Sequence, residues 1–191
     1  MAQRFLRETT AEVLFDDFSR GLYSTDASIY QIKPLGVVVP KTEQDVLATL
    51  GIANDAGVSV TMRGGGTSQC GQTVGEGIIV DVSKHLNRLI SVDPETRRAV
   101  VQPGIVLDQL NALLKPHGLF FPVDVSTSSR ATIGGMTANN SCGARSIRYG
   151  KMVDNVRAVD AVLADGNQMH FGEWGNGAAS NSPDWQQQLV S

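Results

Sequence analysis

The sequence is poor in the features that mark several large classes of protein. Only two of its 191 residues are cysteine, Cys70 and Cys142, and without a C-x-x-C pair they predict neither a zinc site nor a redox motif. A reducing cytoplasm is therefore the default compartment. Apolar runs are well short of the roughly 20 residues of a membrane span, and the polar first residues do not resemble a signal peptide. We expect no membrane span and no metal site.

Charge and histidine are also scarce. Charged residues make up 18% of the chain, and the net charge of −3 argues against a basic surface for nucleic acid. Hydrophobic residues, at 41%, indicate a globular fold rather than disorder. His117 falls at a predicted helix end and His85 and His170 border predicted strands, so a structural role is favoured for each. No carboxylate pair or charge-relay set stands out, and the catalytic residues stay unknown.

The first third of the chain is typical of alternating helices and strands. Residues 8–24 carry apolar residues at helical spacing and predict a helix that stops at Gly21. Residues 30–62 predict a strand, a helix and a second strand, with Thr42 as the helix cap and Gly57 as the helix stop. A unit of this length suits a right-handed parallel crossover.

Short strands joined by tight turns follow. Strands are predicted at 77–83, 86–93 and 97–104, a helix at 105–118, and a hairpin around the Asp165–Gly166 turn. This order of elements predicts an α+β fold of two small α/β subdomains. One is a parallel strand-helix-strand unit, and the other is a mostly antiparallel sheet with helices. Along the chain we expect a helical lead-in (1–30), a main domain (31–172) and a flexible linker rich in glycine, serine and asparagine (173–191).

The glycine-rich run "RGGGTSQCGQTV", residues 63–74, allows several interpretations. A dinucleotide fingerprint would need a third glycine where Gln69 stands, and a P-loop would need lysine where Gln72 stands. The third interpretation is a loop whose glycines, Gly64 to Gly66, expose consecutive backbone N–H groups to a diphosphate. An ordinary glycine-rich turn is the remaining alternative.

A second segment, residues 121–156, is nearly free of large apolar residues and dense in serine, threonine, asparagine and glycine. Long stretches of this kind in a compact domain are usually functional or disordered. The Gly134–Gly135 pair precedes a short run compatible with a helix, which favours function. Its hydroxyls, amides and glycines suit a large polar ligand with an aromatic ring system.

Six stretches carry a family resemblance: "PLGVVVPKTEQDV", "RGGGTSQCGQ", "VQPGIVLDQLNALL", "FPVDVSTSSRATIGG", "NNSCGARSIRYG" and "DNVRAVDAVLADG". Over residues 30–172 the chain resembles the FAD-binding domain of the vanillyl-alcohol oxidase / p-cresol methylhydroxylase flavoprotein superfamily. More narrowly, it resembles the D-lactate, D-2-hydroxyglutarate and glycolate dehydrogenase branch. The preceding "GLYSTDASIYQIKPLGVVVP" is similar to long members that carry an iron–sulfur module after the flavin domains. An iron–sulfur cluster is expected only in such a C-terminal module.

The resemblance implies a set of cofactor-binding residues and FAD held between the two subdomains. The glycine loop would bind the FAD pyrophosphate, the start of the second segment would run along the cofactor, its later part would line the ribityl chain and flavin ring, and one late strand residue would lie near the adenine. Because the loop lacks histidine, FAD is expected to be noncovalent. Cys142 stands where relatives often carry glycine, and we expect its thiol to pack. In the order of these roles the residues are Arg63, Gly64, Gly65, Gly66, Thr67, Ser68 and Gln72; Pro122, Asp124 and Ser126; Thr132, Gly134, Gly135, Ala138, Asn140, Ser141 and Gly143; and Val159.

The function implied is oxidation of a D-2-hydroxy acid by hydride transfer to flavin, with a separate electron acceptor. The alternatives are a flavin electron-transfer module or NAD(P)H-dependent reductase of the same fold, and a phosphate-binding module without redox chemistry. In the family, the base and the substrate-binding arginine come mostly from a cap domain and C-terminal segment, so we expect this stretch alone to bind FAD without turnover. The full-length protein is expected in the cytoplasm, with the inner face of a membrane as the alternative location.

Overall fold

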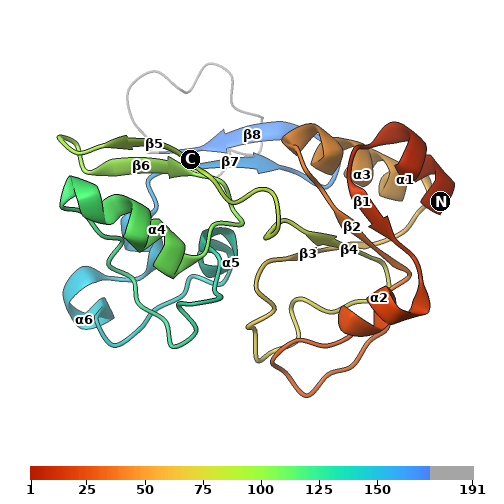
Figure 1. The fold of residues 1–191 in the computed structure, drawn as a ribbon, viewed down its shortest axis with the longest axis horizontal. Coiled ribbons are helices and arrows are strands. Elements are labelled where there is room, and N and C mark those ends of the chain that lie inside the picture. Colours follow the sequence, from red (N-terminus) through yellow and green to blue (C-terminus); the bar gives the residue numbers. More distant parts are fainter. Residues whose placement is uncertain (173–191) are drawn as a thin grey trace, which may run out of the picture.

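The structure, a computed structural model, describes residues 1–172 and places them in two lobes (Figure 1). The linker predicted at 173–191 lies outside the described residues. The elements in chain order are α1 (Ala2–Glu8), β1 (Glu12–Leu14), α2 (Asp17–Leu22), β2 (Gly36–Val39), α3 (Glu43–Asp55), β3 (Val60–Arg63), β4 (Ile78–Asp81), β5 (Leu89–Asp93), β6 (Arg98–Val101), α4 (Leu107–Leu114), the 3-10 helix η1 (Lys115–His117), α5 (Ile133–Ala138), α6 (Ser146–Tyr149), α7 (Met152–Asn155), β7 (Val159–Val162) and β8 (Gln168–Phe171).

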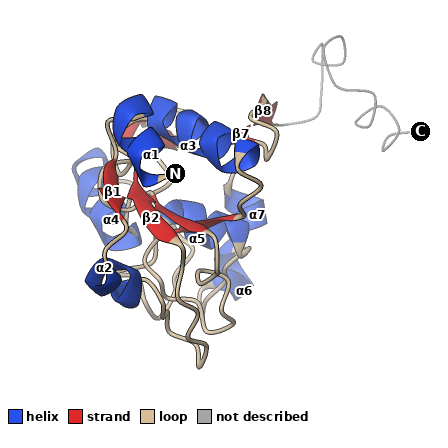
Figure 2. Cartoon of the chain, turned by 90° about the vertical axis from the view of Figure 1, so that its right-hand side faces the viewer, coloured by secondary structure: helices blue, strands red, loops and turns tan. Residues whose placement is uncertain are grey.

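The first lobe is built on a four-stranded sheet of order β1-β2-β4-β3. Strands β2 and β4, and β4 and β3, are parallel, and β1 is antiparallel to β2. The short apolar strands β2 and β4 are buried along their whole length, as expected for central parallel strands covered on both faces. One face packs against α1 and α3 through Phe5 and Ile52, and the other against the end of α2 through Tyr23. Figure 2 shows the sheet between these helices.

The predicted helix of the parallel unit is confirmed as α3. The Thr42 hydroxyl accepts a hydrogen bond from the Asp45 backbone N–H, and the Asp45 carboxylate accepts one from the Thr42 N–H. This reciprocal pair satisfies N–H groups that the first turn leaves without helical partners. Gly57, with φ of +62°, ends the helix as predicted.

Two expectations for this lobe are wrong. The continuous helix predicted at 8–24 is divided, because residues 12–14 form β1 and pair with the open edge of β2. The helical lead-in predicted at 1–30 therefore also contains a strand. Helix α2 begins only after Asp16, whose carboxylate accepts from the Ser19 N–H at 2.9 Å. The strand predicted at 77–83 belongs to the parallel sheet and lies between β2 and β3, not with the antiparallel strands.

The second lobe has a separate apolar core, against which the antiparallel hairpin β5–β6 packs, and a further antiparallel hairpin, β7–β8, follows in the chain. The predicted turns are confirmed: Asp93 accepts from the Thr96 hydroxyl between β5 and β6, and Asp165 accepts from the Asn167 N–H between β7 and β8. Helix α4 continues into η1 and ends at Gly118, whose φ is +68°. The core beneath it contains residues of α4, α5 and α7, including Leu110, Met136 and Met152.

Candidate cofactor site

The glycine loop leaves β3 and lies directly against the second segment. A Cβ atom on Gly64 would overlap the Thr132 hydroxyl, and one on Gly65 would overlap the Arg130 carbonyl oxygen. Only glycine permits so close an approach. The two segments chosen from the sequence therefore meet, and they meet where the two lobes join.

The backbone N–H groups of this loop are free to bind an anion. Among the hydrogen bonds within residues 1–172, none is donated by the backbone N–H groups from Gly64 to Gln69. Gly66 takes a φ of +63°, a backbone conformation that brings successive N–H groups into a concave, anion-binding arrangement. Thr67 and Ser68, both half-buried, bring hydroxyl groups to the same loop. This row of unpaired donors is the feature that fits the diphosphate of FAD.

The Arg63 side chain links the loop to another part of the chain. Its guanidinium donates to the carbonyl oxygens of Thr25 at 2.9 Å and Thr73 at 3.3 Å. It also lies 5.2 Å from the centre of the Tyr23 ring, within the range of a cation–π contact. Gln72, predicted to share the pyrophosphate, is exposed on the same loop.

In the second segment, the backbone is fixed by its own polar groups. The buried Thr132 hydroxyl caps α5 by accepting from the Gly135 N–H at 3.3 Å. A Cβ atom on Gly134 would lie 2.6 Å from Pro103 Cβ, so glycine is required for this contact. The Asp124 carboxylate accepts from the Arg145 N–H at 3.0 Å, and Gly143 packs against the Asp124 backbone.

The other predicted residues of this segment lie before, within and just after α5 in the chain. Asn140 has a φ of +45° and its side-chain oxygen accepts from the Val153 N–H. The Ser141 backbone bonds to Met136 and Met152. Pro122 is half-buried, whereas Ser126 and Ala138 are exposed.

Val159 lies on a separate hairpin. It belongs to β7, pairs with Phe171 and is 37% exposed. The structure thus joins the glycine loop to the start of α5 and joins Asp124 to Gly143, but it does not bring Val159 into either group of contacts.

One segment of this site was missed from the sequence. Residues 25–31 reach across to the glycine loop, where the Ala27 N–H donates to the Gly66 carbonyl oxygen at 3.1 Å. The Thr73 hydroxyl donates to Asp26 at 2.9 Å, and the Tyr30 ring lies against Gly71. The available signal was an aspartate two residues before a serine, which is typical of a side chain that folds back on its own backbone.

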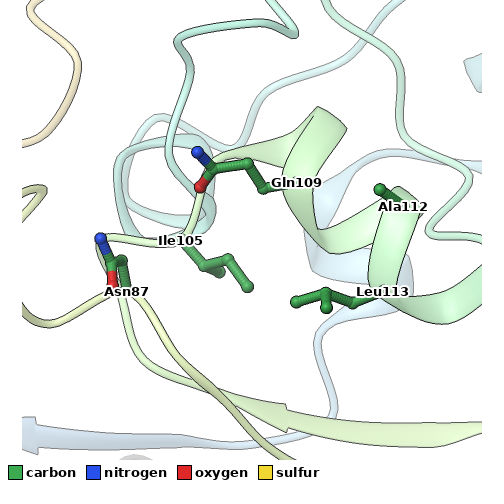
Figure 3. A pocket seen from close by; sticks show the side chains of 5 residues that line it. All are labelled: Asn87, Ile105, Gln109, Ala112 and Leu113. Atoms are coloured by element: carbon green, nitrogen blue, oxygen red, sulfur yellow. The ribbon is translucent and has the colours of Figure 1, made fainter.

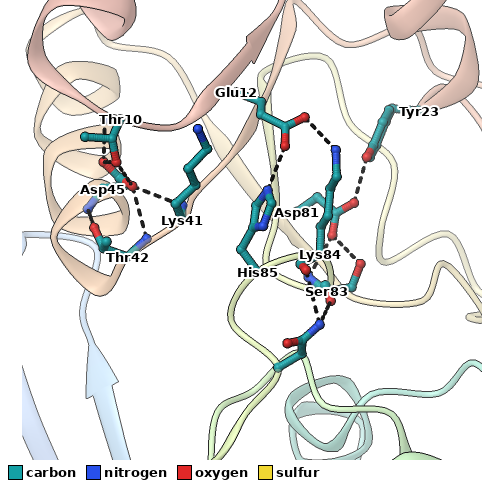
Figure 4. A network of polar contacts seen from close by, with 11 residues as sticks. Thr10, Glu12, Tyr23, Lys41, Thr42, Asp45, Asp81, Ser83, Lys84 and His85 are labelled. Atoms are coloured by element: carbon teal, nitrogen blue, oxygen red, sulfur yellow. Dashed lines mark hydrogen bonds and ion pairs between the residues drawn. The ribbon is translucent and has the colours of Figure 1, made fainter.

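A network of polar contacts lies at the end of the parallel sheet (Figure 4). Tyr23 donates to the buried Asp81 at 2.7 Å, and burial together with this bond raises the Tyr23 pKa. Hydrogen bonds from Lys84 and His85 hold the pKa of the Glu12 carboxyl below its usual value. His85 is thus paired with a carboxylate on β1, and the structural role predicted for it fits this position.

Two cavities lie elsewhere. One, of about 350 Å³, is a mostly apolar hollow beside α4 lined by Asn87, Ile105, Gln109, Ala112 and Leu113 (Figure 3). The other, of about 340 Å³, lies at the start of α3. Neither is lined by the glycine loop. Within the described residues, no cluster of three or more histidine, cysteine, aspartate or glutamate side chains could hold a metal ion. No helix of residues 1–172 is both long and apolar enough to cross a membrane.

Comparison with known proteins decides the family. A family model described as an FAD binding domain matches residues 34–172. The chain belongs to this FAD-binding family. The predicted cofactor, FAD, and the predicted superfamily are thereby confirmed.

Relatives and solved structures agree with this assignment. D-2-hydroxyglutarate dehydrogenase of Pantoea ananatis is 46% identical over 147 residues, which cover 75% of this chain and 14% of that protein. Glycolate oxidase subunit GlcD of Bacillus subtilis is 38% identical over 163 residues, covering 83% of this chain and 34% of the relative. A structure of alkyldihydroxyacetonephosphate synthase matches with a TM-score of 0.80 at 21% identity, over 94% of this chain and 36% of that one. The α+β fold is confirmed, and the FAD-binding chain spans only a minor part of these proteins.

Proposed function

We propose that this FAD-binding chain holds FAD noncovalently for an enzyme that oxidises a D-2-hydroxy acid. The single observation that carries the cofactor site is the row of unpaired N–H groups from Gly64 to Gln69, held against the start of α5. The substrate class is supported by the relatives, whose names specify the oxidation of 2-hydroxyglutarate and of glycolate. Both compounds are 2-hydroxy acids.

In this proposal the pyrophosphate binds to backbone N–H groups and hydroxyls rather than to a cation. The guanidinium of Arg63 is already hydrogen-bonded to two carbonyl oxygens, so neutral donors carry most of the interaction. Oriented amides in a concave loop act as fixed partial positive charges. Arg63 holds the loop, and Gln72, exposed on the same loop, would also bind the pyrophosphate.

The second segment would hold the rest of the cofactor. Pro122, Asp124 and Ser126 would run beside it, and the residues around α5 would line the ribityl chain and the ring: Thr132, Gly134, Gly135, Ala138, Asn140, Ser141 and Gly143. Val159 would lie near the adenine end. We further propose residues 31–172 as the FAD-binding domain, with β1 completing its sheet. FAD, when bound, supplies the hydride acceptor, and the residues named here bind and orient it.

Binding of FAD to the purified chain tests the cofactor site. We expect the fluorescence of added FAD to be quenched and the flavin absorption band to shift, with thermal stabilisation that exceeds the effect of ATP. No binding, even after refolding with FAD, would refute the proposal. Stabilisation by ATP greater than by FAD would favour the phosphate-binding alternative.

Anaerobic reduction tests the reaction. The complete enzyme, loaded with FAD, is mixed with D-2-hydroxyglutarate, D-lactate or glycolate, and separately with NADPH, and the flavin absorbance is followed. We expect a D-2-hydroxy acid to bleach the flavin and NADPH to leave it unchanged. Bleaching by NADPH alone would support the reductase alternative instead.

A further inference from the structure

We propose that residues 25–31, here called the bracing segment, position the glycine loop for the cofactor although they lie outside the predicted FAD-binding stretches. This inference rests on the proposed FAD site and adds residues that act on FAD through the loop. Four contacts carry it: a backbone hydrogen bond, the bonds of a carboxylate, an aromatic contact and the hydrogen bonds of Arg63.

The backbone contact sets the direction of an N–H group in the loop. The Ala27 N–H donates to the Gly66 carbonyl oxygen at 3.1 Å. A trans peptide is planar, so the carbonyl of Gly66 and the N–H of Thr67 point in opposite directions. Holding the carbonyl toward the bracing segment therefore turns the Thr67 N–H away from it, where it is free for a ligand.

The carboxylate of Asp26 ties the bracing segment to the far end of the loop. One oxygen accepts from the Ser28 N–H at 2.8 Å and the other from the Thr73 hydroxyl at 2.9 Å. Burial raises the pKa of this carboxyl, but the bonds from Ser28 and Thr73 outweigh it and the pKa is lowered. Asp26 is therefore an ionised acceptor at neutral pH, and its bonds are stronger than those of a neutral pair.

An aromatic contact and the Arg63 clamp complete the bracing. Gly71 has a φ of +77°, and a Cβ atom there would lie 2.6 Å from Tyr30 Cδ2. The Arg63 guanidinium joins the Thr25 carbonyl to the Thr73 carbonyl. Both ends of the loop are thus tied to the bracing segment, while the N–H groups from Gly64 to Gln69 donate to no other group within residues 1–172.

Asp26→Ala, Asp26→Asn and the control Asp93→Ala are compared by titration of FAD into the purified chain, with fluorescence quenching as the readout. Asp93 is matched because it also accepts from a threonine hydroxyl and from an N–H two residues later, but at the tip of β5–β6. We expect Asp26→Ala to weaken FAD binding about tenfold, since a charge-assisted hydrogen bond is lost. Asp26→Asn should stay within about twofold, because its amide accepts from Ser28 N–H and donates to the Thr73 hydroxyl. Asp93→Ala should bind FAD as the wild type does.

The Thr73 side of the contact gives a second measurement. Thr73→Val should weaken binding as Asp26→Ala does, Thr73→Ser should restore it, and combining Thr73→Val with Asp26→Ala should cause no further loss. If the wild type fails to bind FAD, the proposed function itself is refuted. If the wild type binds FAD and both Asp26→Ala and Thr73→Val bind it equally well, the bracing role alone is overturned. Equal weakening by Asp93→Ala would also overturn it, because general destabilisation would then explain the loss.

Discussion

Replacing Gly65 with alanine tests whether close approach, rather than backbone conformation, requires glycine in the loop. Gly65 is not among the glycines with positive φ, so alanine could adopt its backbone angles. The obstacle is the Arg130 carbonyl oxygen, which the new Cβ atom would overlap. The loop and the second segment would have to move apart, and they form the two sides of the proposed FAD site.

The expected magnitude follows from two opposing effects. Forcing an extra carbon into a close contact costs about 1–3 kcal/mol, whereas alanine returns about 0.4–1 kcal/mol by restricting the unfolded chain. The net loss is on the order of 1–2 kcal/mol, which lowers the Tm of a domain of this size by about 2–8 °C. FAD affinity should fall by about tenfold or more, because displaced N–H groups lose charge-assisted bonds to the diphosphate.

Gly51→Ala is the matched control. Gly51 is exposed in α3, and its new Cβ atom would meet nothing within 4 Å. Because alanine favours a helix over glycine by about 1 kcal/mol, this variant should unfold at a higher temperature and bind FAD normally. Thermal unfolding without ligand and FAD titration measure both effects. If Gly65→Ala kept the wild-type Tm and affinity, the close contact with Arg130 would not be what requires glycine.

Two further changes probe the sheet lobe and the second segment. The buried Asp45 accepts from the N–H groups of Thr10, Lys41 and Thr42; burial raises its pKa, but these bonds lower it more. A lowered folded pKa adds stability above the ordinary value near 3.9 that is lost as the pH falls toward the folded pKa. Asp45→Asn should therefore cost about 2 kcal/mol at pH 7 and flatten the loss of stability below pH 4 in urea unfolding; an unchanged acid slope would contradict this. Gly143→Ala should weaken FAD binding and lower the Tm by several degrees, because its Cβ atom would overlap the Asp124 backbone; unchanged FAD titration and melting curves would contradict the predicted packing.

Local signals were sufficient where one segment decides its own structure. Thr42 and Gly57 mark the two ends of α3 by capping chemistry alone, and the Asp165–Gly166 turn sets the β7–β8 hairpin. The prediction of a helix through residues 12–14 was wrong because a short run with apolar residues fits a helix or a strand equally well. The open edge of β2 decides between them, and that edge exists only in the folded sheet.

Some segments of the candidate site could likewise be predicted from local sequence, and others could not. The glycine loop and the second segment were predictable because glycine, serine and threonine are required by the contacts that they make. The bracing segment was missed because the bond from Ala27 to Gly66 uses only backbone groups, which any residue except proline at position 27 could supply. Arg63 was expected at the pyrophosphate because the family resemblance implied that role. Its contacts with Thr25 and Thr73 depend on the folded position of residues far away in the chain.

An anion site made of neutral N–H groups depends on its surroundings more than a site made of lysine or arginine. Unpaired amides are costly when shielded from water, so the loop must be held open by contacts that do not use its N–H groups. Here those contacts come from both sides: the bracing segment holds the Gly66 carbonyl and Gly71, and the second lobe packs on Gly64 and Gly65. A ligand that binds this loop therefore stabilises the junction of the two lobes, and the stabilisation grows with the ratio of ligand concentration to Kd. FAD should thus raise the unfolding temperature of both lobes together, whereas a ligand confined to one lobe would leave the other unchanged.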